Sequence, residues 1–329
     1  MKRPDGAVLE VSVEVQRRAM RVQATFELAA GERLALYGPS GAGKTTVLEA
    51  IAGLAPLSQG AVRIDGRLVA GRCGREPAVA PRARRVGIVR QPTTTFPHLT
   101  VRENVAYGAR RRGPSVEGLL EQLGLAELRD ARPYELSGGQ RQRVALGRAL
   151  ACDYRTLLLD EPFSAVDVAT RRGLRRFAVE HASKRGAASI LVTHDLAEAQ
   201  AFGERLGIVD QGQVLQLGEA HDVVRRPATR RVAELLGYEG FTPVDSVRDD
   251  RLLALHPDRV VPGAIMDHGV VLEGTVVAAE ALGPRYAWLI VLARGGTCVV
   301  HADDPVESGR RVTVTALDPP LVAAVDSDG

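Results

Sequence analysis

The sequence is poor in cysteine and in aromatic residues, and it has no long apolar run. Its three cysteines, Cys73, Cys152 and Cys298, are far apart and odd in number, so we expect them to be reduced and structural. The longest apolar run near the C-terminus, residues 287–293, is far shorter than the roughly 20 residues that span a bilayer. Residues 1–6 lack the apolar stretch of a secretory signal. If the protein serves a membrane, we expect a peripheral subunit on the cytoplasmic side of the cell membrane.

The sequence also lacks a strong excess of positive charge, since its formal net charge is +3. Its arginine clusters, at residues 82–85, 110–112 and 171–176, are not interleaved with aromatic residues, which is typical of solvated faces. We therefore expect no nucleic-acid partner. The charge is uneven: residues from Phe241 onward carry 7 Lys/Arg against 13 Asp/Glu, which is −6 and leaves +9 for the preceding part. This difference predicts a change of domain near Phe241.

A glycine-rich stretch near the N-terminus has the spacing of a phosphate-binding P-loop. It follows a short apolar strand at residues 34–37 and precedes a helix at residues 46–53, as the motif requires. Its glycines allow backbone N–H groups and the positive end of the helix to face one phosphate chain. We expect Lys44 to reach the β- and γ-phosphates and Thr45 to ligate Mg²⁺. The motif is Gly38-Pro39-Ser40-Gly41-Ala42-Gly43-Lys44-Thr45-Thr46. This context argues against a simple glycine-rich turn but leaves many classes of nucleoside triphosphatase open.

The order of apolar patterns predicts two domains in the 329 residues. Residues 156–162 and 189–195 are apolar runs that end in polar residues, as central parallel strands do. Alternation over residues 8–28 predicts a β-meander, and residues 99–150 have helical periodicity. After residue 250 only short strands follow, which favours a small antiparallel barrel. The predicted limits are 1–237 for a nucleotide-binding domain, 238–250 for a linker and 251–329 for the β domain.

Polar residues stand at the C-terminal ends of three predicted strands, residues 85–91, 156–162 and 189–195, where ligands bind in an open α/β sheet. Asp160 can hold Mg²⁺, and Glu161 can orient and deprotonate an attacking water. His194 can contact a γ-phosphate, and Gln91 can ligate Mg²⁺ or position water. Each has a plain alternative: a helix-capping pair for the two acids, a core histidine for His194 and a loop residue for Gln91. Their joint occurrence in this order favours a catalytic site.

The segment Leu136-Ser137-Gly138-Gly139-Gln140 opens a second predicted helix with a serine and two glycines. This makes a second anion site, which a chain with one triphosphate needs only if that site serves another molecule. Here the sequence resembles the ATP-binding cassette (ABC) ATPases over residues 9–237. The resemblance covers the P-loop, the Q-loop residue Gln91, this pentapeptide as the signature motif, and Asp160 with Glu161 as the Walker B acids. It also covers residues 164–167 as the D-loop and His194 as the switch histidine.

The resemblance implies an α/β P-loop NTPase with a parallel core sheet, an antiparallel β subdomain and a helical subdomain. It implies ATP and Mg²⁺ as ligands and a homodimer in which each P-loop faces the partner's signature helix. Residues 137–140 and Asp167 would then contribute to nucleotide binding between the two copies. Gln91 and residues 93–99 would carry the motion to integral-membrane permease subunits, and a solute-binding protein would act indirectly.

The sequence departs from the family pattern at two positions. ABC ATPases commonly stack adenine on an aromatic residue about 25 to 30 residues before the P-loop lysine, but residues 10–25 contain none. Phe26 lies just beyond this range, and Arg17 or Arg18 is the candidate to stack on adenine instead. The residue before the Q-loop glutamine is commonly aromatic and here is Arg90.

The strand-rich tail resembles the TOBE domain of importer ATPases, with His256-Pro257-Asp258-Arg259-Val260 at a position where such domains often have a proline and an acid. The resemblance implies an OB-like regulatory domain and an importer. The short β-meander without a base-stacking aromatic residue, followed by residues 85–87 and 96–99, looks most like molybdate importer ATPases, and ferric iron, sulfate, polyamine or sugar are the alternative cargoes. A soluble ABC ATPase that acts on DNA or ribosomes would need a long coiled-coil insertion or a second cassette, and the sequence contains neither. A binding module that does not hydrolyse ATP would be expected to lack Glu161 or His194, and both are present. We therefore predict an ATPase that energises an importer, with an oxyanion such as molybdate as its cargo.

Overall fold

The computed structural model describes residues 7–17, 20–71, 79–109, 115–244, 251–263 and 269–323. Cys73, Arg18 and the arginines at 110–112 lie outside the described residues. The chain divides into two compact units, Met1–Leu217 and Gly218–Gly329. The limits of 1–237, 238–250 and 251–329 stay a prediction. None of the described helices is long and apolar enough to cross a membrane.

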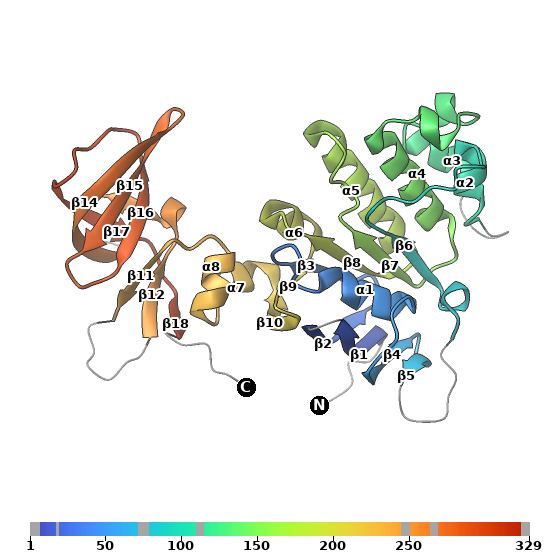
Figure 1. Cartoon of the computed structure of the whole chain (residues 1–329), viewed down its shortest axis with the longest axis horizontal. Coiled ribbons are helices and arrows are strands. Elements are labelled where there is room, and N and C mark those ends of the chain that lie inside the picture. Colours follow the sequence, from blue (N-terminus) through green and yellow to red (C-terminus); the bar gives the residue numbers. More distant parts are fainter. Residues whose placement is uncertain are drawn as a thin grey trace. The chain divides into compact units, whose positions relative to one another are not determined.

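A six-stranded sheet forms the centre of the first unit (Figure 1). Its order is β10-β9-β3-β8-β7-β6, and every pair from β9 to β6 is parallel. The strands are β3 (Arg33–Tyr37), β6 (Val86–Val89), β7 (Thr156–Asp160), β8 (Ala188–Thr193), β9 (Arg205–Asp210) and β10 (Gln213–Glu219). All residues of β7 and β8 are buried, which confirms the two predicted central strands.

Two hydrophobic cores lie on opposite faces of this sheet because successive side chains of a strand point to opposite faces. Leu158 of β7 belongs to the core that includes α1 (Lys44–Ala52) and the antiparallel sheet. Its neighbours Leu157 and Leu159 belong to the other core, which the remaining helices of this unit cover. Those helices are α2 (Val101–Ala106), α3 (Val116–Gln122), α4 (Gly138–Ala151), α5 (Val168–Ser183) and α6 (Leu196–Phe202).

The antiparallel sheet of the first unit has the order β2-β1-β4-β5. Its strands are β1 (Ala7–Arg17), β2 (Met20–Ala29), β4 (Gln59–Ile64) and β5 (Arg67–Gly71). Leu9, Val11, Val13 and Val15 of β1 are buried on one face, as the alternating pattern predicts. Short 3-10 helices connect other elements of the chain: η1 (Pro81–Ala83), η2 (Ala126–Leu128), η3 (Pro133–Glu135) and η4 (Pro257–Arg259).

The second unit contains an eight-stranded antiparallel sheet, which agrees with the predicted OB-like all-β domain. The order is β13-β17-β14-β15-β16-β11-β12-β18, and β13 also lies close to β16, so the sheet curls. The strands are β11 (Gly240–Pro243), β12 (Arg251–Leu255), β13 (Val260–Pro262), β14 (Val270–Leu282), β15 (Arg285–Leu292), β16 (Thr297–Ala302), β17 (Arg311–Ala316) and β18 (Leu321–Ala323). Two short helices, α7 (Ala220–Arg225) and α8 (Arg230–Leu235), precede the sheet in the sequence.

Strand β11 lies within the segment that we expected to be a linker. Gly240 and Pro243, which bound this strand, made the segment look like a turn. A Cβ atom on Gly240 would lie 2.6 Å from the carbonyl oxygen of Thr297, so the glycine permits a close approach to the end of β16. The remaining linker residues, 245–250, lie outside the described part of the chain.

A buried arginine holds the C-terminal end of α1. The guanidinium of Arg84, which is 4% exposed, donates to the carbonyl oxygens of Ala50 (3.1 Å) and Ile51 (2.9 Å). It also donates to the carbonyl of Val79 at 2.8 Å. Burial lowers the pKa of Arg84, and these carbonyls compensate its desolvation. The P-loop helix is therefore fixed at its far end by a charged cap.

We expect Arg84→Ala to lower the free energy of unfolding by about 2–4 kcal/mol, because carbonyl groups at the end of α1 lose their charged partner. Denaturant unfolding of the purified chain measures this change. Arg63→Ala is the matched control, because Arg63 is exposed and its guanidinium makes a long hydrogen bond, 3.4 Å, to the Gly66 carbonyl. Equal stability of the two variants would contradict the capping role.

Candidate functional site

The predicted P-loop connects β3 to α1 as a tight turn of glycines. A Cβ atom on Gly38 would lie 1.9 Å from the carbonyl oxygen of Val209, so only glycine fits beside β9. Gly43, the residue before α1, has a φ of 101°, which lies in the left-handed region that favours glycine. The free N–H groups at the start of α1 and the helix dipole together favour a bound anion.

Lys44 is the first residue of α1, and its side chain folds back along the loop. Its Nζ donates to the carbonyl oxygens of Gly38 (2.7 Å) and Pro39 (2.8 Å). The residue is 5% exposed, and burial lowers the pKa of Lys44, while the nearby carboxylates of Glu161 and Asp160 oppose this shift. A buried ammonium group at the mouth of a phosphate loop is suited to bind phosphate oxygens.

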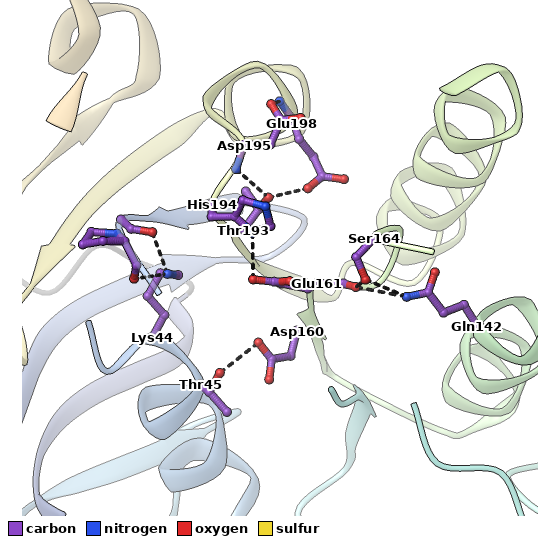
Figure 2. Close-up of polar contacts among 12 residues, drawn as sticks. Lys44, Thr45, Gln142, Asp160, Glu161, Ser164, Thr193, His194, Asp195 and Glu198 are labelled. Carbon is purple, nitrogen blue, oxygen red and sulfur yellow. Dashed lines mark hydrogen bonds and ion pairs between the residues drawn. The ribbon is translucent and has the colours of Figure 1, made fainter. Parts of the chain in front are cut away.

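Thr45 and Asp160 bring two oxygen ligands together. The Thr45 hydroxyl donates to Oδ1 of Asp160 at 3.1 Å (Figure 2). Burial raises the pKa of Asp160, and the hydrogen bonds from Thr45 and from the Gln91 backbone oppose that rise. The backbone of the exposed Gln91 is thus hydrogen-bonded to the Asp160 carboxylate. Hydroxyl and carboxylate oxygens are ligands that Mg²⁺ accepts together with phosphate oxygens, so Thr45 and Asp160 fit the ion. The contact that brings Gln91 to this pair is that of its backbone.

Glu161 turns away from β7 and meets His194. Its φ of 44° lies in the left-handed region, which is strained for a residue with a side chain. Its backbone N–H donates to the Val192 carbonyl at 3.0 Å. Its Oε1 lies 2.9 Å from Nδ1 of His194, so the sheet edge pairs the predicted base with the predicted switch histidine (Figure 2).

The residues on either side of His194 are fixed by a buried carboxylate that the sequence analysis missed. The Thr193 hydroxyl donates to Oε2 of Glu198 at 2.5 Å and accepts from the Asp195 N–H at 3.1 Å. Asp195 in turn caps α6 by accepting from the Glu198 N–H at 3.0 Å. Burial raises the pKa of Glu198. The sequence signal was the acid three residues after a capping residue, a common helix start.

The signature segment forms the N-terminal cap of α4. The Gln140 N–H donates to the Ser137 hydroxyl at 3.2 Å, and the Ser137 N–H donates to Oε1 of Gln140 at 2.7 Å. Gly138 and Gly139 follow as the first helical residues. Within one chain α4 and Lys44 lie apart: Figure 2 places Lys44 and Gln142 on opposite sides of Glu161.

Asp167 of the predicted D-loop caps the next helix. Its carboxylate accepts from the Thr170 N–H at 2.9 Å at the start of α5. Hydrogen bonds of this cap lower the pKa of Asp167. The capping contact is a structural function of this residue within its own chain.

Comparisons with known proteins identify the family. The ABC transporter family model matches residues 22–164. The sulfate/thiosulfate import ATP-binding protein CysA of Rhodopseudomonas palustris is 39% identical over 314 residues, which cover 86% of this chain and 87% of that protein. The chain belongs to the ABC transporter ATPases. The predicted family and P-loop fold are confirmed, and ABC ATPases use ATP with Mg²⁺.

Two further relatives match about two thirds of this chain. The Fe(3+) ions import ATP-binding protein FbpC of Mesorhizobium japonicum is 41% identical over 217 residues, 64% of this chain and 59% of that protein. The CysA protein of Nocardia farcinica is 43% identical over 220 residues, 65% of this chain and 64% of that protein. The matched part thus spans less than two thirds of these two relatives.

Solved structures of ABC proteins are also similar. A dimeric ATP-binding cassette in a post-hydrolysis state with ADP and Pi has a TM-score of 0.55 and 27% identity, covering 64% of this chain and 98% of that chain. A bacterial Atm1-family ABC exporter with ATP bound has a TM-score of 0.59 and 27% identity, covering 70% and 42%. The similarity therefore covers the cassette fold and not the whole chain.

The two positions at which this ABC ATPase departs from the family pattern involve Arg17 and Arg90, and both arginines bind the same carboxylate. Glu49 of α1 forms ion pairs with Arg17 through Oε2 and with Arg90 through Oε1, the latter at 2.8 Å. Phe26, the nearest aromatic residue, is 4% exposed in the core and is not free to stack on a base. Glu49 thereby links the end of β1 to the residue before Gln91.

The buried charge of Asp160 predicts an unusual effect of pH on stability. Because the folded pKa is raised, the ionised carboxylate costs stability above the ordinary value of 3.8, and that cost is lost as pH falls toward this value. We expect Asp160→Asn to raise the Tm of the nucleotide-free protein at pH 7 by about 2–4 °C, with a smaller gain near pH 4. Thermal unfolding followed by circular dichroism measures both values.

Asp167→Ala is the control of opposite sign. The cap lowers the pKa of Asp167, so its ionised form stabilises the fold above pH 3.8 and is lost as pH falls below that value. We expect this variant to have a lower Tm at pH 7. An unchanged or lowered Tm of Asp160→Asn at pH 7 would show that burial of the Asp160 charge has no net cost.

Proposed function

We propose that this chain is the ATP-hydrolysing subunit of an ABC importer and acts as a homodimer at the cytoplasmic face of the cell membrane. The observation that carries the proposal is the convergence of Lys44, the Thr45–Asp160 pair and the Glu161–His194 pair at one edge of the parallel sheet. These are the groups that phosphoryl transfer to water requires: cations for the phosphates, ligands for Mg²⁺ and a base for the water.

Each group has a role that follows from its position. The P-loop N–H groups and the Lys44 ammonium bind the β- and γ-phosphates and fix the direction of attack. Thr45, Asp160 and Gln91 would hold Mg²⁺, which neutralises charge on the phosphate oxygens when bound. Glu161 accepts the proton of the attacking water. His194 is hydrogen-bonded to the Glu161 carboxylate and holds that carboxylate toward the γ-phosphate.

The signature segment supports a dimer with two composite sites. Its N–H groups and the Ser137 hydroxyl form an anion site at the start of α4, separate from the P-loop of the same chain. A second copy related by two-fold symmetry brings this site to the γ-phosphate of the opposite P-loop. The similar solved cassette in its ADP and Pi state is described as dimeric, which supports this arrangement.

A cavity beside the Q-loop supports docking of a permease. The cavity has a volume of about 750 Å³, and its apolar surface includes Phe96 and Tyr107. Its charged lining residues are three arginines and one acid: Arg82, Arg85, Arg148 and Asp153. The Arg148 guanidinium lies 4.8 Å from the centre of the Phe96 ring and donates to the Thr94 carbonyl at 2.6 Å. We infer that an amphipathic helix of the permease with an acidic side chain occupies this cavity, because its charge complements the arginines.

The cargo we propose is a tetrahedral oxyanion. Relatives that match both units of this chain include proteins named as sulfate/thiosulfate importers, from Rhodopseudomonas palustris and Bradyrhizobium diazoefficiens. One from Rhodococcus jostii is named for Fe(3+) import, so iron is the alternative. Molybdate, the oxyanion that we expected from the sequence, shares the tetrahedral shape and double negative charge of sulfate and stays within the proposal. We assign the curled β sheet to a TOBE-like regulatory domain.

We expect Glu161→Gln to lower the rate of ATP hydrolysis by about 100-fold or more, because the amide cannot accept the proton of the water. ATP binding is retained, so the variant forms an ATP-dependent dimer. Phosphate release measures the rate, and light scattering after size exclusion measures the dimer. Glu121→Gln, at an exposed position on α3, is the matched control and should hydrolyse ATP at the wild-type rate. Hydrolysis at the wild-type rate by Glu161→Gln would refute the mechanism.

We expect deletion of the gene in its host to abolish high-affinity uptake of one solute. Uptake of sulfate, molybdate, ferric iron, putrescine and a maltodextrin is measured at limiting concentration. The wild-type gene should restore uptake and Glu161→Gln should not, since import depends on hydrolysis. Loss of sulfate or molybdate uptake supports the oxyanion, and loss of iron uptake selects the alternative. Unchanged uptake of all five solutes would contradict the proposed cargo.

A further inference from the structure

Gln142 lies one turn into α4, beyond the signature segment, and its side chain is buried at 5% exposure. Its Nε2 donates to the Ser164 hydroxyl at 2.9 Å and to the Glu161 carbonyl at 3.4 Å. Its Oε1 accepts from the Ala165 N–H at 3.0 Å. One amide thus contacts three residues that follow β7. Figure 2 shows its contacts with Ser164 and Glu161.

The chain between Glu161 and Ala165 is held tightly against α4. The Ser164 hydroxyl donates to the Glu161 carbonyl at 3.1 Å, so this carbonyl accepts from two side chains. A Cβ atom on Gly139 would lie 2.9 Å from the Ala165 carbonyl oxygen, which shows how close α4 comes to this segment. Displacement of the start of α4 would therefore move the backbone of Glu161.

Both ends of Glu161 are thereby fixed from different elements. Its carbonyl is held through Gln142 of α4, and its carboxylate is held by His194 at the end of β8. Its left-handed φ of 44° is a strained conformation that persists only where the surroundings impose it. The contacts of Gln142 supply part of that constraint.

We propose that Gln142 is a positioning residue that transmits the state of the signature helix to Glu161 of the same chain. This rests on the proposed function, in which the signature segment contacts the ATP of the opposite site. ATP held at one composite site then orders α4, and through Gln142 sets the carboxylate that acts in the other site. The two sites become cooperative because one helix serves both.

The amide is suited to this task because it donates and accepts at once. Methionine has a similar length and no hydrogen-bonding amide, so Gln142→Met removes the contacts while filling the space. Gln142→Ala removes both contacts and volume. Gln122→Ala, at an exposed position of α3, is the matched control.

The test measures phosphate release by the purified full chain against ATP concentration. We expect a Hill coefficient above 1 for wild type and Gln122→Ala. For Gln142→Met we expect a Hill coefficient near 1, a rate at saturation lowered by about 10-fold or more, and half-saturation within about twofold of wild type. Wild-type cooperativity and rate in Gln142→Met would overturn the proposal, as would a wild-type Hill coefficient of 1. A wild-type protein without ATP hydrolysis would instead refute the proposed function.

A second measurement separates positioning from a purely structural role. In the Glu161→Gln background, adding Gln142→Met should leave the ATP-dependent dimer unchanged. In the proposal Gln142 acts only on the carboxylate of Glu161, which this background lacks, and not on the dimer contact. Loss of the dimer would overturn the proposal, since Gln142 would then support the signature surface itself. Gln142→Ala is assayed in the same way if Gln142→Met fails to fold, as judged by thermal unfolding without nucleotide.

Discussion

The burial of Lys44 and Asp160 at one edge of the sheet is the constraint on which the site depends. Burial lowers the pKa of the ammonium and raises the pKa of the carboxyl, so both charges are disfavoured, although each partly offsets the other. In the proposed function each charge is completed by a ligand of opposite charge: phosphate for Lys44 and a divalent cation for Asp160. Ligand binding would then offset the cost that burial imposes on these charges in the free protein, a common property of active sites.

The sequence was informative wherever a function requires a local pattern. The P-loop, the buried strands β7 and β8 and the polar residues at their ends were predictable, because spacing and hydrophobic alternation specify them within a few residues. Arg84, Gln142 and Glu198 were not predicted. Arg84 and Gln142 act through contacts with segments about 20 to 34 residues away, which no local pattern specifies. Glu198 acts through Thr193, close in sequence, but its burial depends on the packing of α6.

The same distinction explains why strand β11 of the second unit was not predicted. Alternation located most strands of the curled sheet, but β11 contains Gly240 and Pro243, residues that usually mark turns. Tertiary packing outweighs the turn preference of Gly240, because the close approach of β16 leaves no room for a side chain at this position. In the first unit, the role of Arg90 was likewise not predictable from the residues around it. Its role became visible only with Glu49 of α1, which lies 41 residues earlier in the chain.

The contacts around Glu161 explain why hydrolysis can respond to several parts of the molecule. The buried Glu198 fixes Thr193, Thr193 and Asp195 flank His194, and His194 holds the Glu161 carboxylate. From the other side, α4 holds the Glu161 backbone through an amide. A carboxylate constrained from only one side would retain a free rotation, and its distance to water would vary. Constraint from both sides makes the Glu161 carboxylate sensitive to movement of either element. In the proposed mechanism this would join closure of the site to the onset of chemistry.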